Sequence, residues 1–91
     1  MELIFDSKAK EALEDMINNS NESYIRIKVF YGCGRPAYEI YPSYKDENDL
    51  EIISDGINFV IAKDDARGCI GLEIKYDKET YNKGFYIKDI K

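Results

Sequence analysis

The most constraining feature of this sequence is a pair of apolar runs, 50–54 and 57–61, separated only by Asp55-Gly56. Asp-Gly between two apolar runs is typical of a two-residue type I′ hairpin, because both turn residues must then adopt positive φ. A turn of this length also sets the register, so Ile52 is expected to face Phe59 across the pair. The pattern therefore predicts an antiparallel hairpin in the middle of the chain.

One amphipathic helix is predicted near the beginning of the chain, over residues 8–18. Asp6 or Ser7 is expected to cap it, since each can accept a hydrogen bond from a free N–H of the first turn. Its apolar residues recur with i, i+3, i+4, i+7, i+8 spacing and form one stripe. That stripe, which we expect to pack on the protein's own core rather than on a partner, consists of Ala9, Ala12, Leu13, Met16 and Ile17.

Strict alternation from Tyr24 to Tyr31 predicts a strand in which Tyr31 shares the inward face with the aliphatic residues. Tyr38–Tyr41 is expected to return as a strand that ends at Pro42, because proline cannot donate to a ladder. Further elements are expected at Leu3–Phe5 (an edge strand), Lys63–Arg67 (a helical turn), Leu72–Tyr76 and Phe85–Lys88. One helix followed mostly by strands predicts a strand-dominated α+β fold.

Composition narrows the classes of function. A chain of 91 residues predicts one domain, and its net charge of -5 disfavours nucleic acid and anionic membranes as partners. We find no signal-peptide pattern and no membrane-spanning run, so we expect a cytoplasmic protein. Acidic loop residues that lack the spacing of a cation site are expected to be solvated charges, namely Asp46, Glu47, Asp49, Asp64 and Asp65.

The stretch with the clearest chemical character is Gly32-Cys33-Gly34. Glycines on both sides of a thiol allow close approach to the sulfur, and turn N–H groups with nearby Arg35 favour the thiolate. The chain has two cysteines, no histidine and no Cys-x-x-Cys, which excludes histidine-based triads, histidine-containing zinc sites and a single-chain four-cysteine site. A dimer could supply Cys33 and Cys69 from each copy as metal ligands, with carboxylates or a small thiol completing the site. The residues alone equally allow Cys33 as a loop residue without function, and they favour Cys69 as a small buried hydrophobe over a metal ligand.

The order of these segments resembles the HesB/IscA-like family of A-type iron–sulfur cluster carriers over nearly the whole chain. Gly32–Tyr38 is similar to the first cysteine motif of that family, in its Gly-Cys-Gly-x-Pro variant. The other matching segments are Leu3–Phe5 with its Asp-initiated helix, the hairpin Leu50–Ile61, the strand Leu72–Tyr76 and the Gly-Phe strand Asn82–Ile87.

The resemblance implies a single HesB-like domain over residues 1–91, with a helix packed on a compact mixed β-sheet or pseudo-barrel. It implies an iron–sulfur cluster or iron held by the loop of Cys33, Gly32 and Gly34, in a homodimer that meets assembly or acceptor proteins. Cluster-carrying members have a Cys-x-Cys pair after the Gly-Phe strand, whereas no cysteine follows Phe85 here.

Two alternatives remain open at this point. The chain could be a thiol-redox or thiol-sensing protein that uses Cys33, or an interaction domain with the same fold and no cluster. We expect no enzymatic activity, because no base, nucleophile and orienting group can be assembled from the sequence.

Overall fold

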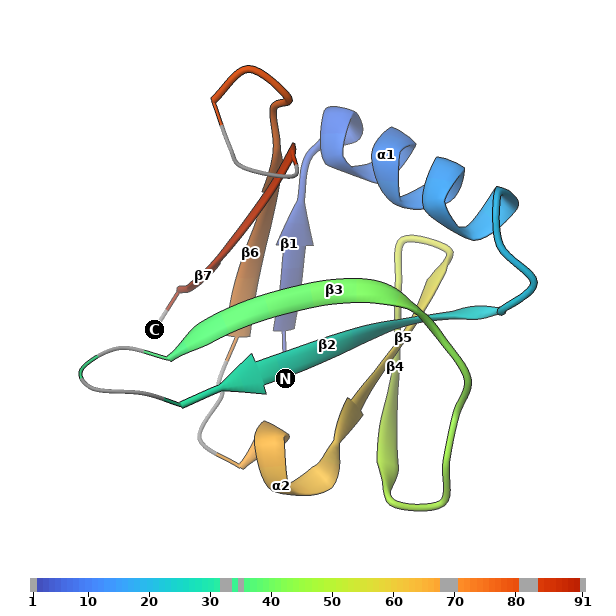
Figure 1. Ribbon diagram of the computed structural model, residues 1–91, viewed down its shortest axis with the longest axis vertical. Coiled ribbons are helices and arrows are strands. Elements are labelled where there is room, and N and C mark those ends of the chain that lie inside the picture. Colours follow the sequence, from blue (N-terminus) through green and yellow to red (C-terminus); the bar gives the residue numbers. More distant parts are fainter. Residues whose placement is uncertain (1, 32–33, 35, 68–70, 81–83, 91) are drawn as a thin grey trace.

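The computed structural model describes residues 2–31, 34, 36–67, 71–80 and 84–90. Within these residues it contains seven strands and two helices (Figure 1). In chain order the elements are β1 (Glu2–Phe5), α1 (Ser7–Asn18), β2 (Tyr24–Phe30), β3 (Ala37–Ser43), β4 (Asp49–Ser54), β5 (Ile57–Ala62), α2 (Lys63–Ala66), β6 (Gly71–Tyr76) and β7 (Phe85–Asp89).

The strands form two mixed sheets. The first has the order β1-β6-β7, in which β1 runs parallel and β7 antiparallel to β6. The second has the order β3-β2-β5-β4, in which β2 and β5 run parallel and the outer pairs are antiparallel. The strand-dominated α+β class predicted from the sequence and the mixed β-sheet implied by the resemblance are therefore confirmed.

The two sheets enclose the core and form an open pseudo-barrel. On one side the Ser54 hydroxyl donates a hydrogen bond to the Leu3 carbonyl at 3.4 Å, which links β4 to β1. On the other side the edge strands β3 and β7 approach one another, although no ladder joins them within the described residues. Among the described residues the two sheets therefore form an incomplete barrel, linked by this hydrogen bond on one side and grooved on the other.

Helix α1 lies across one end of both sheets (Figure 1) and is capped by Asp6, whose carboxylate accepts from the Ala9 N–H at 2.9 Å. Ala9 and Leu13 are completely buried, while Met16 and Ile17 pack against the same core at its edge. The apolar stripe thus faces the protein's own interior, as the sequence predicts. Burial of this apolar stripe provides most of the stability of this twelve-residue helix.

The central hairpin has the predicted geometry. Asp55 and Gly56 have φ of +50° and +82°, and Ile52 lies opposite Phe59 in the β4–β5 ladder. Phe59 is fully buried, and its ring centroid lies 5.9 Å from that of Phe5. Because Phe5 belongs to the first sheet and Phe59 to the second, this aromatic pair ties the two sheets together.

Replacing Gly56 by alanine is expected to lower the free energy of unfolding by about 1 kcal/mol, because positive φ disfavours a β-carbon. No described heavy atom lies within 4 Å of the site of that β-carbon, so the cost is conformational and not a clash. Gly56→Asn is the matched control, since asparagine tolerates positive φ and should cost less. Urea unfolding of both variants checks this, and equal losses would contradict the turn assignment.

Two local predictions on β2 and β3 are wrong. Strand β3 continues through Pro42, which lies opposite Ile25, and ends one residue later. An edge strand tolerates proline because one side of its backbone has no ladder to supply. Tyr31 follows the end of β2 and is 67% exposed, so it does not share the inward face of that strand.

Candidate functional site

The loop that carries the candidate thiol connects β2 to β3. Cys33 and Gly32 lie outside the described residues, so their assignment as ligands stays a prediction. Gly34 is described, has φ of +100°, and leaves open space where a β-carbon would lie, among the described atoms. Positive φ at this position favours glycine, which agrees with the turn expected around the thiol.

The residues that flank this loop are unusually exposed for their type. Phe30, the last residue of β2, pairs with Ala37 and is 48% exposed. Tyr31 and Pro36 are also exposed. The end of β2 and the start of β3 project from the side of the molecule, at the left of Figure 1. The described residues that flank the Cys33 loop in the sequence, two of them aromatic, are therefore accessible to water.

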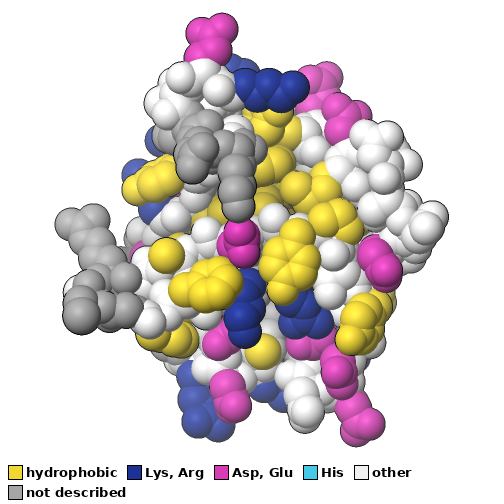
Figure 2. Space-filling view, in the orientation of Figure 1, with side chains coloured by type: hydrophobic (Ala, Val, Ile, Leu, Met, Phe, Trp, Pro, Cys, Tyr) yellow, Lys and Arg dark blue, Asp and Glu magenta, His cyan; other side chains and the backbone are white. Residues whose placement is uncertain are grey.

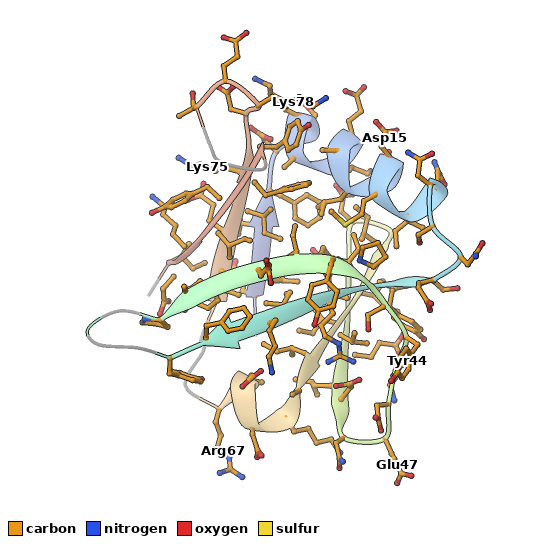
Figure 3. The ribbon with its side chains drawn as sticks, viewed as in Figure 1. Asp15, Tyr44, Glu47, Arg67, Lys75 and Lys78 are labelled. Carbon is orange, nitrogen blue, oxygen red and sulfur yellow. The ribbon has the colours of Figure 1, made fainter. Side chains whose placement is uncertain are left out.

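The second cysteine, Cys69, also lies outside the described residues, between Arg67 and Gly71. Arg67 points away from the molecule beyond the end of α2 (Figure 3), and its side chain is 83% exposed. Gly71 opens β6, and its carbonyl accepts from the Ile90 N–H at 3.2 Å. Cys69 thus precedes β6 by two residues in the sequence, and the start of β6 lies beside the residue that follows β7.

Gly71 is required by close packing. A β-carbon there would lie 2.8 Å from the Ile90 side chain and 3.1 Å from the Glu2 carbonyl oxygen. Both distances are shorter than ordinary van der Waals contact. The start of β6 is therefore held tightly between β1 and the residue that follows β7.

Two adjoining grooves follow the side of the barrel where β3 and β7 meet. The larger, of about 650 Å³, is lined by residues 36–38 and 85–89. The smaller, of about 440 Å³, shares part of this lining and extends to Met16 and Phe30. Figure 2 shows hydrophobic side chains gathered between α1 and β3 on this face. The grooves begin at Phe30 and Pro36, each three residues from Cys33 in the sequence.

A buried polar cluster lies elsewhere on β2 and was missed by the sequence prediction, which treated Asp49 as a solvated charge. Asp49 is only 6% exposed, and its two carboxylate oxygens accept from the Arg26 guanidinium at 2.9 and 2.6 Å. Arg26 also donates to the Ser43 hydroxyl and the Tyr44 carbonyl, and the Asp46 N–H donates to Asp49. This network fastens the loop between β3 and β4 to β2, so its role is structural.

The hydrogen bonds from Arg26 hold the pKa of Asp49 below its ordinary value, against the opposing effect of burial. A carboxylate with a lowered folded-state pKa stabilises the fold fully above its unfolded-state pKa, which is about 3.9, and loses that contribution as the pH falls through the folded pKa. We therefore expect the free energy of unfolding to decline in acid below about pH 4.

Denaturant titrations at a series of pH values check this expectation. Asp49→Asn should show a smaller acid dependence than the native chain. Some dependence should remain, because the Glu79 N–H and the Thr80 hydroxyl also lower the pKa of the exposed Asp77. An unchanged acid dependence in Asp49→Asn would contradict the assignment to Asp49.

The described residues offer no alternative metal centre. Among them, no group of three or more histidine, cysteine, aspartate or glutamate side chains clusters as a metal site would require. Within the same part of the chain, no helix combines the length and apolarity needed to cross a bilayer.

Comparison with known proteins identifies the fold. No protein-family model matches the chain, and no curated protein matches it. Among solved structures, the chain is similar to Escherichia coli SufA, which is involved in the biosynthesis of iron–sulfur clusters. The two structures align with a TM-score of 0.78 at 19% identity, and the alignment covers 99% of this chain and 82% of the SufA chain. The chain has the fold of SufA.

Two further structures agree with this fold. IscA with a [2Fe-2S] cluster aligns with a TM-score of 0.69 at 22% identity, over 94% of this chain and 81% of the IscA chain. A protein from Aquifex aeolicus has a TM-score of 0.64 at 23% identity, over 98% of this chain and 95% of its own. The expected HesB-like fold, a helix packed on a compact mixed β structure, is thus confirmed by its likeness to SufA and IscA.

Proposed function

We propose that this protein carries iron or an iron–sulfur cluster as cargo, bound by the Cys33 thiolate in the loop between β2 and β3. The observation that carries the proposal is the likeness to SufA and IscA over almost the whole chain, combined with the Gly-Cys-Gly motif at the turn. IscA was solved with a [2Fe-2S] cluster, and SufA is involved in the biosynthesis of iron–sulfur clusters. By that likeness we assign this chain to iron–sulfur cluster biogenesis.

The local chemistry favours a thiolate that inorganic cargo can reach. Gly34 has no β-carbon and leaves open space among the described atoms, so little steric bulk opposes approach. From the sequence we expect the N–H groups of the glycine-rich turn and Arg35, two residues after Cys33, to favour the thiolate over the thiol.

The ligand count of the chain favours a site shared by two copies. Iron–sulfur clusters are held mostly by four cysteine thiolates, and this chain has two cysteines and no histidine. Two copies together supply four thiolates, Cys33 and Cys69 from each, and carboxylates or a bound small thiol are the other donors that complete such a site. We therefore propose a homodimer that receives or delivers its cargo through assembly or acceptor proteins, and assign it no enzymatic reaction.

Anaerobic reconstitution with ferrous iron and sulfide tests the proposal. The native protein should develop visible absorbance and bind about one iron per chain, which is one two-iron cluster per two copies. Protein whose thiols have been blocked with iodoacetamide is the control and should stay colourless. A folded native sample that gains neither colour nor iron would refute the carrier function.

The same samples separate the two alternative functions. If no cargo binds, rapid reaction of Cys33 with a thiol probe at neutral pH would favour thiol sensing. If Cys33 also reacts slowly with the probe, thiol sensing is disfavoured as well, and protein binding is the remaining candidate function.

A further inference from the structure

We propose that the outer edge of β4 binds an extended segment of a partner protein, which pairs with β4 as an added strand of the second sheet. We call this site the β4 edge and define it by residues 50–53. The segment that fits is amphipathic, with apolar side chains on its inner face and lysine or arginine on its outer face. The site uses no cysteine, so it is independent of the cargo proposed above.

The β4 edge has backbone groups that no other described residue bonds. Strand β4 pairs with β5 on one side only. The two-residue turn makes Ser54 and Ile57 a hydrogen-bonded pair, because such a turn bonds its first carbonyl to its fourth N–H. Bonded and non-bonded pairs alternate along an antiparallel ladder, so the N–H and C=O groups of Glu51 and Ile53 point away from β5. An added strand would bond to these groups.

Strand β4 lacks the features that usually protect the edge of a sheet, which are proline, lysine, a bulge or short length. Edge strand β3 contains Pro42, β7 contains Lys88, and β1 has only four residues. In contrast, β4 has six residues without proline, lysine or arginine, and it pairs with β5 residue for residue. The end of β4 next to the turn bonds to Leu3, but its other end lies apart from β1 (Figure 1). Residues 50–53 are therefore open to pairing.

The side chains of the β4 edge present apolar surface to water. Leu50 and Ile52 alternate with Glu51 and point toward the interior, where Ile52 packs against the core. Leu50 is nevertheless 40% exposed, so the interior side of the sheet is not fully covered beside it. On the outer face Ile53 is 67% exposed. The side chains of an added strand would lie next to these residues and bury apolar area that water now reaches.

The charges around the β4 edge select a basic segment as the occupant. Glu51 is exposed and accepts a hydrogen bond from the Tyr24 hydroxyl at 3.5 Å. On the neighbouring strand β1, Glu2 is also exposed, and neither carboxylate forms an ion pair with a described residue. The loop before β4 adds Asp46 and Glu47. A second copy of this acidic chain would place like charges across the new pair, which is destabilising, whereas lysine or arginine would complement them.

Binding of a synthetic peptide tests the proposal. The probe is a labelled, capped peptide of about eight residues in which valine and lysine alternate, so that one face is apolar and the other basic. We expect its fluorescence anisotropy to rise as native protein is added. A peptide with glutamate in place of lysine should bind about tenfold more weakly or worse, because the charge match is lost. N-methylation of alternate amides should weaken binding by about as much, because it removes backbone donors.

Variants of β4 locate the binding site. Ile53→Pro removes an outward N–H that the ladder with β5 does not use, and it should weaken binding by about tenfold or more. Ile53→Thr is the matched control, since threonine keeps the N–H and the branched shape, and it should bind within about threefold of the native chain. Glu51→Lys should lose as much as Ile53→Pro, because it puts like charges across the pair. Glu79→Lys makes the same change at an exposed residue after β6 and should bind as the native chain does.

Amide hydrogen exchange of the native protein gives a second readout that needs no variant. The amides of Glu51 and Ile53 should exchange more slowly with the lysine peptide bound, whereas that of Ile52, already bonded to β5, should change little. No rise in anisotropy, equal binding of the lysine and glutamate peptides, full binding by folded Ile53→Pro, or unchanged exchange at Glu51 and Ile53 would each overturn the proposal. Self-association of the protein that Ile53→Pro abolishes would also overturn it, because the occupant would then be a second copy.

Discussion

Replacing Cys33 by serine is expected to abolish binding of the iron–sulfur cargo while the fold remains intact. A serine oxygen is a much poorer ligand for iron in a cluster than a soft thiolate. Mutation of a residue that only orients a metal ligand typically lowers metal affinity by about 10–100-fold. Loss of a ligand itself should therefore reduce bound iron by at least about tenfold. In the sequence, position 33 lies beyond Phe30 and Ala37, the last pair of the β2–β3 ladder, so we expect the fold to tolerate the change.

Two comparisons make this result specific. Ile53→Ser introduces the same side chain at an exposed position on β4 and should bind as much iron as the native chain. Cys69→Ser should also lose most of its iron if the four thiolates of two copies form the site. Iron content, visible absorbance and thermal unfolding measured on all three variants check this. Normal iron content in folded Cys33→Ser would rule out Cys33 as the ligand.

Replacing Arg26 by alanine is expected to produce the largest loss of stability among the changes considered, about 3 kcal/mol. The change leaves the Asp49 carboxylate, whose side chain is 4% exposed, without the two strong hydrogen bonds from the guanidinium. An unpaired buried charge costs far more than the net worth of the pair. For a chain of this size the expected fall in melting temperature is about 15 °C.

The exposed ion pair between Lys10 and Asp55, at 3.4 Å, provides the matched control. Lys10→Ala should cost less than about 1 kcal/mol, because solvent screens charges on the surface. The double variant Arg26→Ala/Asp49→Ala should recover part of the loss, since it removes the buried charge together with its partner. A loss below about 1 kcal/mol in Arg26→Ala would show that the cluster behaves as a surface salt bridge.

Local sequence patterns predicted an element correctly where that element depends only on its own residues. Asp55 and Gly56 adopt positive φ because the turn between two apolar runs is two residues long, and the register of Ile52 with Phe59 follows from it. Helix α1 begins at its predicted cap because Asp6 can satisfy a free N–H at short range. Short-range steric and hydrogen-bonding rules decide such features.

The same patterns failed where a residue's surroundings come from distant parts of the chain. Asp49 is separated from Arg26 by 23 positions, and its loop sequence gives no sign that an arginine will meet it. Pro42 was expected to end its strand, because the sequence did not reveal that β3 would lie at the edge of a sheet. Both errors concern neighbours across strands, which spacing along one strand does not specify.

The sequence by itself determined the elements, the central hairpin, the strand-dominated class and the thiol between two glycines. The tertiary structure decided the division into two sheets, the burial of the Arg26–Asp49 pair and the groove between β3 and β7. The reason is the range of the interactions. Turns, caps and periodicity act within a few residues, whereas a groove, a buried ion pair or an edge strand exists only after segments far apart in the chain have packed together.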